Sequence, residues 1–92
     1  MIWTVIVSRD FLKDLARIPA KTRNRIEDFV FQTLSGAVDP FALGKIEKLQ
    51  GYEGYHKVRI GDYRIGLAID KQAGRLALLR VLHRRDIYRH FP

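Results

Sequence analysis

The dipeptide Gly61-Asp62 lies between two runs in which apolar and polar residues alternate, YHKVRI before it and YRIGLAID after it. Alternation of this kind is typical of half-buried β-strands, because successive side chains of a strand point to opposite faces. A two-residue loop that begins with glycine is typical of a type II′ turn, which joins neighbouring antiparallel strands. The sequence therefore predicts a β-hairpin over residues 55–70, and the rest of the chain must supply the layer that covers it.

The short loop also predicts the register of this hairpin, since a shift by one residue would exchange its two faces. The expected cross-strand pairs are Ile60 with Tyr63, Arg59 with Arg64, Val58 with Ile65, and Lys57 with Gly66. One face is then apolar, and the other is cationic. Like charges that face each other destabilise a hairpin unless an anion lies between them, and we expect the glycine opposite Lys57 to leave room for one.

The chain has 92 residues, which is enough for one domain over residues 1–92 with a single modest core. Its net charge of +7 is unevenly distributed. Residues 1–44 contain six Lys or Arg and five Asp or Glu, whereas residues 45–92 contain eleven and five. We therefore expect a polyanion such as nucleic acid to bind the second half of the chain.

The sequence contains no cysteine, and its three histidines lack the spacing of metal ligands, so we expect neither a metal nor another cofactor. No apolar run approaches the roughly 20 residues that a membrane-spanning helix needs. The apolar N-terminal segment has no basic region before it and no small-residue cleavage site after it, so we interpret it as a strand. These features predict a cytoplasmic protein that does not associate with membranes.

The segments around the hairpin predict two helices and two further strands. Residues 2–7 are rich in β-branched residues, as in a strand, and Ser8 is a suitable N-cap for a helix that follows. A longer helix is expected over residues 20–34, and residues 75–82 resemble a central strand that is apolar on both faces except at Arg80. Residues 45–55 are expected to be irregular. The order βααβββ predicts an α+β fold, with an antiparallel-rich sheet of about four strands and a two-helix hairpin on one side.

The ordered segments KLQGY, YHKVRIGDYRI and LLRVLHRRDIY resemble the RelE/ParE toxin superfamily of bacterial and archaeal toxin–antitoxin pairs. The resemblance extends over essentially the whole chain and is strongest from Lys48 to Tyr88. It implies a RelE-like fold and the function of a toxin. RelE-like members are ribosome-dependent mRNA endonucleases, whereas ParE-like members inhibit DNA gyrase without cutting RNA. The implied partners are a small, acidic, neutralising antitoxin, the ribosome and mRNA.

The RelE catalytic pattern, carried over residue by residue, matches a set of basic and aromatic residues in this chain. Two positions depart from the archetype, which has a lysine where this chain has Arg59 and does not rely on a histidine at the position of His83, although some relatives do. The resemblance implies that the catalytic residues are Lys57, Arg59, Arg64, His83, Arg84 and Tyr88, with Arg85 as an alternative to Arg84. Further contacts to RNA are expected from Lys48, Tyr55, Arg80 and Arg85.

These residue types suit metal-independent cleavage, in which the 2′-OH of RNA attacks its neighbouring phosphate and leaves a 2′,3′-cyclic phosphate and a 5′-OH. The reaction needs a base, an acid and charge stabilisation. Arginines suit the last role because a guanidinium makes bidentate contacts to phosphate and stays charged. Lys57 and His83 compete for the proton transfers, since neighbouring like charges disfavour the ammonium form of a lysine and imidazole changes its charge near neutral pH. Two alternatives stay open: a ParE-like gyrase inhibitor without nuclease activity, and a non-catalytic RNA-binding module.

Overall fold

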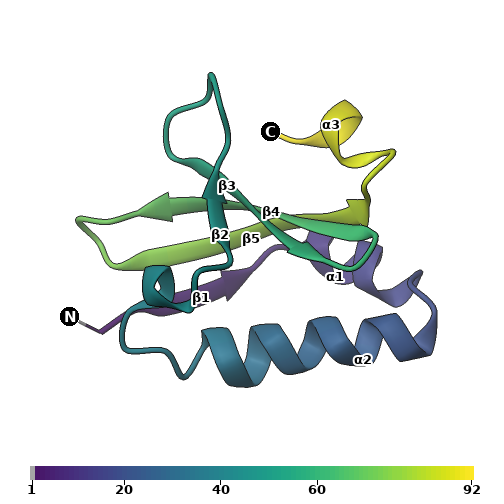
Figure 1. Cartoon of the computed structure of the whole chain (residues 1–92), viewed down its shortest axis with the longest axis horizontal. Helices are drawn as coiled ribbons and strands as arrows, with labels where there is room; N and C mark the ends of the chain where they lie inside the picture. Colours follow the sequence, from purple (N-terminus) through teal and green to yellow (C-terminus); the bar gives the residue numbers. More distant parts are fainter. Residues whose placement is uncertain (1) are drawn as a thin grey trace.

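A computed structural model describes residues 2–92, which form a five-stranded sheet with the two longest helices packed on one face (Figure 1). The elements are β1 (Thr4–Val7), α1 (Arg9–Ala16), α2 (Ala20–Asp28), the π-helix η1 (Phe29–Leu34), the 3-10 helix η2 (Pro40–Leu43), β2 (Ile46–Lys48), β3 (Tyr55–Ile60), β4 (Tyr63–Asp70), β5 (Arg75–His83) and α3 (Ile87–His90). Helix α2 runs beneath the sheet in Figure 1, whereas α3 and the β2–β3 loop lie above it. The predicted α+β class is confirmed.

The sheet has five strands, one more than expected, in the order β1-β5-β4-β3-β2. The additional strand is β2, which pairs antiparallel with β3 inside the segment that we expected to be irregular. Three residues are too few to show an alternating pattern in sequence, so β2 can be recognised only from its pairing with the edge of β3. At the other edge of the sheet, β1 pairs with β5 in parallel, and all other pairs are antiparallel.

The predicted hairpin and its register are confirmed. Arg59 lies opposite Arg64, and Lys57 lies opposite Gly66. Gly61 has a φ of 58° whereas Asp62 does not have a positive φ, as a type II′ turn requires. The cationic side chains of the hairpin therefore share one face of the sheet, and α1, α2 and η1 cover the other.

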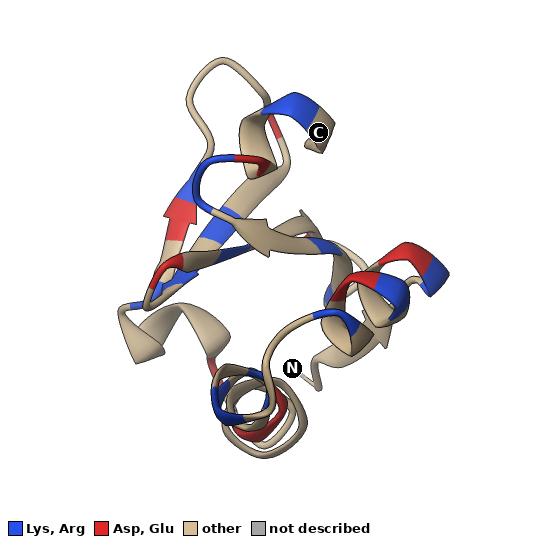
Figure 2. Ribbon diagram, turned by 90° about the vertical axis from the view of Figure 1, so that its right-hand side faces the viewer, with Lys and Arg blue, Asp and Glu red and all other residues tan. Residues whose placement is uncertain are grey.

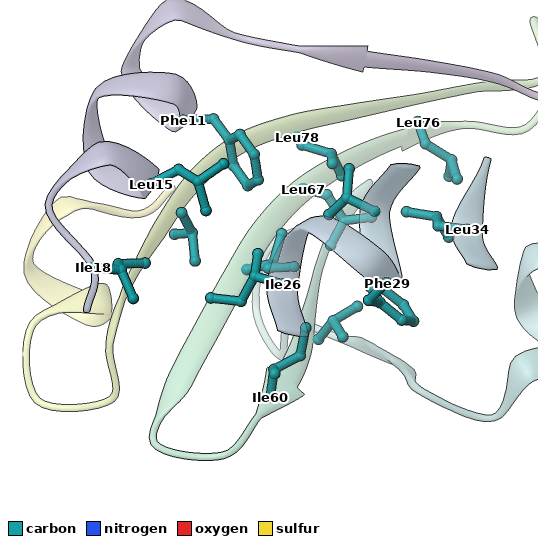
Figure 3. Packing of buried hydrophobic residues seen from close by; sticks show 14 of the residues in the cluster. Phe11, Leu15, Ile18, Ile26, Phe29, Leu34, Ile60, Leu67, Leu76 and Leu78 are labelled. Atoms are coloured by element: carbon teal, nitrogen blue, oxygen red, sulfur yellow. The ribbon is translucent and has the colours of Figure 1, made fainter. Parts of the chain in front are cut away.

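The apolar face of the sheet packs against α1, α2 and η1 to form the main core (Figure 3). Helix α1 begins as predicted, since the Ser8 side chain accepts a hydrogen bond from the Phe11 N–H. Figure 3 shows Phe11 and Ile26 pointing from the helices toward Leu67 and Leu78 of the strands, and all four side chains are completely buried. Burial of each such side chain stabilises the fold by about 1.5–3 kcal/mol. This core holds the sheet rigidly beneath the residues of its opposite face.

Strand β5 extends past the end of β1. Along this part of β5, residues in and next to α1 replace β1 as hydrogen-bond partners of the β5 backbone. The Ser8 N–H donates to the Leu78 carbonyl at 2.9 Å, and the Asp14 carboxylate accepts from the Val81 N–H at 3.1 Å. The same carboxylate accepts from Nε and Nη2 of Arg80, at 2.7 and 3.0 Å. Hydrogen bonding to Asp14 raises the pKa of Arg80 above its ordinary value. Arg80, for which we expected an RNA contact, instead joins β5 to α1.

The C-terminal tail covers part of the opposite face of the sheet with a second, smaller apolar cluster. Leu49, Ile87 and Phe91 are its buried members. The ring of Phe91 lies on the backbone of Gly66, where an added Cβ would be only 2.6–2.7 Å from three ring carbons. An aromatic ring therefore fills the space that we expected an anion to occupy, and that expectation was wrong.

Candidate active-site cleft

A small cleft on the face of the sheet away from α2 brings together most of the predicted catalytic residues. We call it the cationic cleft; it has a volume of about 110 Å³ and is lined by Glu47, Lys57, Arg59, Arg64, Arg84 and Tyr88. Four of these six side chains are cationic and one is anionic. Figure 2 shows Lys and Arg, in blue, on the strands and on the C-terminal tail, above helix α2, which is seen end-on. The cleft can therefore attract a phosphate group.

Tyr88 reaches the cleft from the tail and is joined to strand β3 by Lys57. The Nζ of Lys57 donates to the Tyr88 hydroxyl at 3.0 Å and lies 5.5 Å from the centroid of its ring. The Tyr88 side chain is 58% exposed, so both its hydroxyl and its ring are accessible to a ligand. The pair gives the cleft a cation and a hydroxyl in direct contact.

Arg64 is held in place by the hairpin turn. Its Nη1 donates to the carbonyls of Gly61 and Tyr63, at 2.8 and 2.9 Å. These two bonds occupy both N–H groups of Nη1 and leave the three N–H groups of Nε and Nη2, which form the fork that binds two phosphate oxygens. The two hydrogen bonds also offset the repulsion between Arg64 and Arg59, which face each other across the hairpin.

Arg84 enters the cleft from the turn after β5. Its backbone N–H donates to the Asp62 carbonyl at 2.7 Å, and its Nε lies 3.8 Å from Oδ1 of the same residue. Both side chains are more than half exposed, so this ion pair is weak and the guanidinium can turn to a ligand. The structure thus brings Arg84, and not the alternative Arg85, into the lining of the cleft.

Glu47 is the cleft residue that sequence analysis missed. It lies on β2 directly opposite Lys57 and, among residues 2–92, is the only carboxylate that lines the cleft. The signal that could have revealed it is the order Ile46-Glu47-Lys48, which places Glu47 on the same face as Lys57 once β2 is paired with β3. Without knowledge of that pairing, the segment cannot be distinguished from a loop.

His83 does not line the cationic cleft. It lies opposite Tyr63 at the end of β5, and the two rings meet edge to face with their centroids 5.6 Å apart. The Nδ1 of His83 accepts a hydrogen bond from the Arg85 N–H at 3.2 Å, which stabilises the turn after the strand. Its imidazole instead borders a separate hollow of about 340 Å³ together with Asp86. His83 therefore lies outside the cleft that the other predicted catalytic residues line.

None of the four residues expected to contact RNA lines the cleft, and two of them, Tyr55 and Lys48, make other contacts. Tyr55 packs against the tail, with its ring centroid 5.7 Å from that of Phe91. Lys48 lies opposite His56, and both residues line another hollow, which also contains Lys71. Neither residue lines the cleft, and their contacts with RNA stay a prediction.

Burial lowers the pKa of His56 below its ordinary value. The positive charges of Lys71 and Lys48 lower it further, whereas a hydrogen bond between Nδ1 and the Gly54 carbonyl, at 3.3 Å, acts in the opposite direction. The lowered pKa favours the neutral imidazole of His56 and makes the stability of the fold sensitive to acid.

Within residues 2–92, no group of three or more His, Cys, Asp or Glu side chains could hold a metal ion. The helices of this part of the chain are also too short or too polar to cross a membrane. The cationic cleft itself offers a carboxylate that can accept a proton, a lysine–tyrosine pair that can donate one, and three guanidinium groups that can neutralise a phosphate. Its side chains therefore suit a phosphodiester as ligand.

Comparison with known proteins places the chain among toxins of toxin–antitoxin systems. Residues 5–88 match the family described as ParE toxin of type II toxin-antitoxin system, parDE. Toxin RelE3 of Methanocaldococcus jannaschii is 35% identical over 89 residues, which cover 96% of this chain and 98% of that protein. Toxin RelE of Mycobacterium tuberculosis is 34% identical over 88 residues, covering 96% and 88%. The toxin in the crystal structure of the RelB-RelE antitoxin-toxin complex from Methanococcus jannaschii superposes with a TM-score of 0.76 at 32% identity, covering 95% of this chain and 99% of that one.

Proposed function

The chain belongs to the RelE/ParE toxin superfamily, and on that basis we propose that it is a ribosome-dependent mRNA endonuclease that inhibits translation. The observation that carries the proposal is the cationic cleft, where Lys57, Arg59, Arg64, Arg84 and Tyr88 surround a volume suited to one phosphate group. A toxin that acts only by binding has no need of both a carboxylate and a proton donor in the lining of such a volume. The proposal therefore rests on the composition of the cleft as well as on the family.

The cleft residues can divide the reaction among themselves. Glu47 accepts the proton of the attacking 2′-OH, and the O2′–P bond forms as the P–O5′ bond breaks. The Lys57 ammonium donates through the Tyr88 hydroxyl, to which it is hydrogen-bonded, and the proton is delivered to O5′. We assign the acceptor role to Glu47 rather than to Lys57 because Glu47 is a carboxylate and is the cross-strand neighbour of Lys57 on β2.

The guanidinium groups of the cleft stabilise the charge that develops on the phosphate. Arg64 is suited to this task because the hairpin turn already orients it, so little reorganisation is needed in the transition state. Arg59 faces Arg64 across the hairpin and can hold a second oxygen. DNA lacks the attacking 2′-OH and is not a substrate.

The partners that we propose are the ribosome, mRNA and a small acidic antitoxin. The net charge of +7 suits both polyanions and an acidic protein segment that orders as it binds. A related toxin has been crystallised with its antitoxin RelB, and a similar partner would neutralise this chain. We also propose that the protein acts in the cytoplasm, where ribosomes translate mRNA.

The proposal is tested with purified protein, ribosomes and mRNA, by mapping the 5′ ends of the fragments against the reading frame. We expect cuts only in ribosome-bound mRNA, with 5′-OH and cyclic phosphate ends. Arg64→Ala should lower the cleavage rate by about a hundredfold, corresponding to about 3 kcal/mol of transition-state stabilisation. Arg75→Ala, an exposed strand arginine outside the cleft, is the matched control and should cut at the wild-type rate.

The outcome that contradicts the proposal is an intact mRNA, or an Arg64→Ala variant that cuts as fast as the wild type. Thermal melts of both variants show whether a loss of activity is caused by unfolding. In cells, we expect the protein alone to arrest growth, and a small partner encoded beside it to relieve the arrest.

The second candidate is a ParE-like inhibitor of DNA gyrase, which the match to the ParE toxin family favours. It requires inhibition of supercoiling by purified gyrase and no cleavage of ribosome-bound mRNA. The same pair of assays also identifies a non-catalytic RNA-binding module, which would bind RNA and leave both mRNA and gyrase activity unchanged.

A further inference from the structure

The ring of Phe91 lies directly on the backbone of strand β4 at Gly66. A Cβ built on Gly66 would lie 2.6–2.7 Å from three carbons of this ring, which is much closer than real Cβ contacts. The Phe91 side chain is only 4% exposed. The Phe91 ring can therefore pack at this position only because residue 66 has no side chain.

Gly66 and Phe91 are each connected to a residue that lines the cationic cleft. Gly66 is the cross-strand partner of Lys57, and Phe91 follows Tyr88 by three residues in the tail. Lys57 and Tyr88 are themselves joined by the 3.0 Å hydrogen bond from Nζ to the hydroxyl. A displacement of Phe91 away from Gly66 would thus move the backbone that carries Tyr88.

Tyr88 is held by buried residues on either side of it. Ile87 before it is 1% exposed, and Phe91 after it packs edge-on against Tyr55. The helix between them, α3, has only four residues and cannot form a stable turn without such packing. Tyr88 itself is 58% exposed and is not one of the buried residues of this cluster.

We propose that Phe91, seated on Gly66, is a positioning residue that holds the Tyr88 hydroxyl at Lys57. Phe91 does not touch the substrate and acts through Tyr88 alone. The inference rests on the proposed function, because it assigns Tyr88 to the cleavage reaction. It adds to that function two residues on which the reaction geometry depends. Gly66 has no side chain, and Phe91 lies outside the cleft.

The test is Gly66→Ala, which adds one methyl group beneath the Phe91 ring. The ring of Phe91 must then move, and a displacement of about 1 Å at the reacting groups can lower a rate by about a hundredfold. We expect kcat for cleavage of ribosome-bound mRNA to fall by about that factor, while the Kd for ribosomes changes little because the arginines are not displaced. Gly36→Ala is the matched control: it adds a methyl 2.9 Å from the Gln32 carbonyl, far along the chain from the cleft, and should leave kcat unchanged.

Two double variants separate positioning from a general loss of stability. Because Phe91 acts through Tyr88, Gly66→Ala combined with Tyr88→Ala should be no slower than Tyr88→Ala alone. Gly66→Ala combined with Phe91→Leu should recover much of kcat, because the smaller side chain leaves room for the added methyl. Phe91→Leu alone tests the packing of the Phe91 ring on Gly66 without overpacking. It too should lower kcat more than it raises KM.

A readout that does not depend on activity is the NMR signal of the Tyr88 ring carbon that bears the hydroxyl. We expect it to shift in Gly66→Ala and to return in the Phe91→Leu double variant. An unchanged signal, or effects of Gly66→Ala and Tyr88→Ala that multiply, would overturn the positioning role. If instead Tyr88→Ala cuts at the wild-type rate, the assignment of the cleft under the proposed function is wrong, and the NMR signal alone decides whether Phe91 positions Tyr88.

Discussion

The ion pair between Asp14 and Arg80 is expected to contribute strongly to stability, and Asp14→Ala tests it. The carboxylate accepts three hydrogen bonds, two from Arg80 and one from the Val81 N–H, and its side chain is 6% exposed. In the variant, Val81 keeps a buried N–H without an acceptor, and Arg80 keeps a charge without a counter-ion. Helix α1 also loses one of its links to the part of β5 that β1 does not reach.

The expected magnitude follows from these two losses. An unsatisfied buried backbone donor costs about 1–3 kcal/mol. Breaking a buried ion pair costs about 3–5 kcal/mol, and the low end applies here because the Arg80 side chain is 26% exposed and can be partly hydrated. Since these costs overlap, we expect Asp14→Ala to lower the free energy of unfolding by about 3 kcal/mol. In a domain of this size that lowers Tm by about 12–24 °C.

The assay is urea unfolding followed by circular dichroism, together with a thermal melt. Asp14→Asn keeps an acceptor for the Val81 N–H and should lose about half as much stability. Asp10→Ala, an exposed carboxylate in the first turn of α1, is the control and should cost about 0.3–1 kcal/mol through the helix dipole. A loss of less than about 1 kcal/mol in Asp14→Ala would refute the reasoning. So would an Arg80→Met variant that stays folded but binds RNA more weakly than the wild type, because Arg80 would then serve a ligand.

Three further predictions concern the cleft and His56. Binding to RNA should weaken with salt, and Arg59→Ala should reduce the slope of log K against log salt by about 0.7, whereas Arg75→Ala should leave the slope unchanged. The lowered pKa of His56 means that the unfolded chain binds a proton at this residue more readily than the folded chain does. The free energy of unfolding should therefore be greatest above pH 6.5 and fall as the pH drops below it. His56→Gln should flatten this dependence in urea titrations at pH 7.5 and 5.5. Glu47→Gln should slow cleavage by about 10²–10⁴, and an unchanged cleavage rate would rule out Glu47 as the proton acceptor.

Local sequence pattern determined the parts of this protein whose interactions lie close together along the chain. The hairpin of β3 and β4 is closed by two residues, so its register, its apolar face and the opposition of Arg59 and Arg64 all follow from a stretch of 16 residues. The N-cap at Ser8 and the helical spacing after it are equally local. Because the cationic face of the hairpin is part of this local pattern, the centre of the candidate site can be recognised from the sequence alone.

Only the tertiary structure decided which distant residues meet that face. Lys57 and Tyr88 are 31 positions apart, and Asp14 and Arg80 are 66 apart, and no periodicity relates them. Arg80 has the residue type expected of an RNA contact, but its guanidinium is hydrogen-bonded to the Asp14 carboxylate of α1 and does not line the cleft. The three-residue strand β2, which brings Glu47 to the cleft, exists only because β3 offers it an edge. Such contacts depend on the packing of the whole chain. The entropy of closing the loop between two distant residues sets the free-energy cost of their contact, and the packed core sets its geometry. Neither can be predicted from the two residues that form the contact.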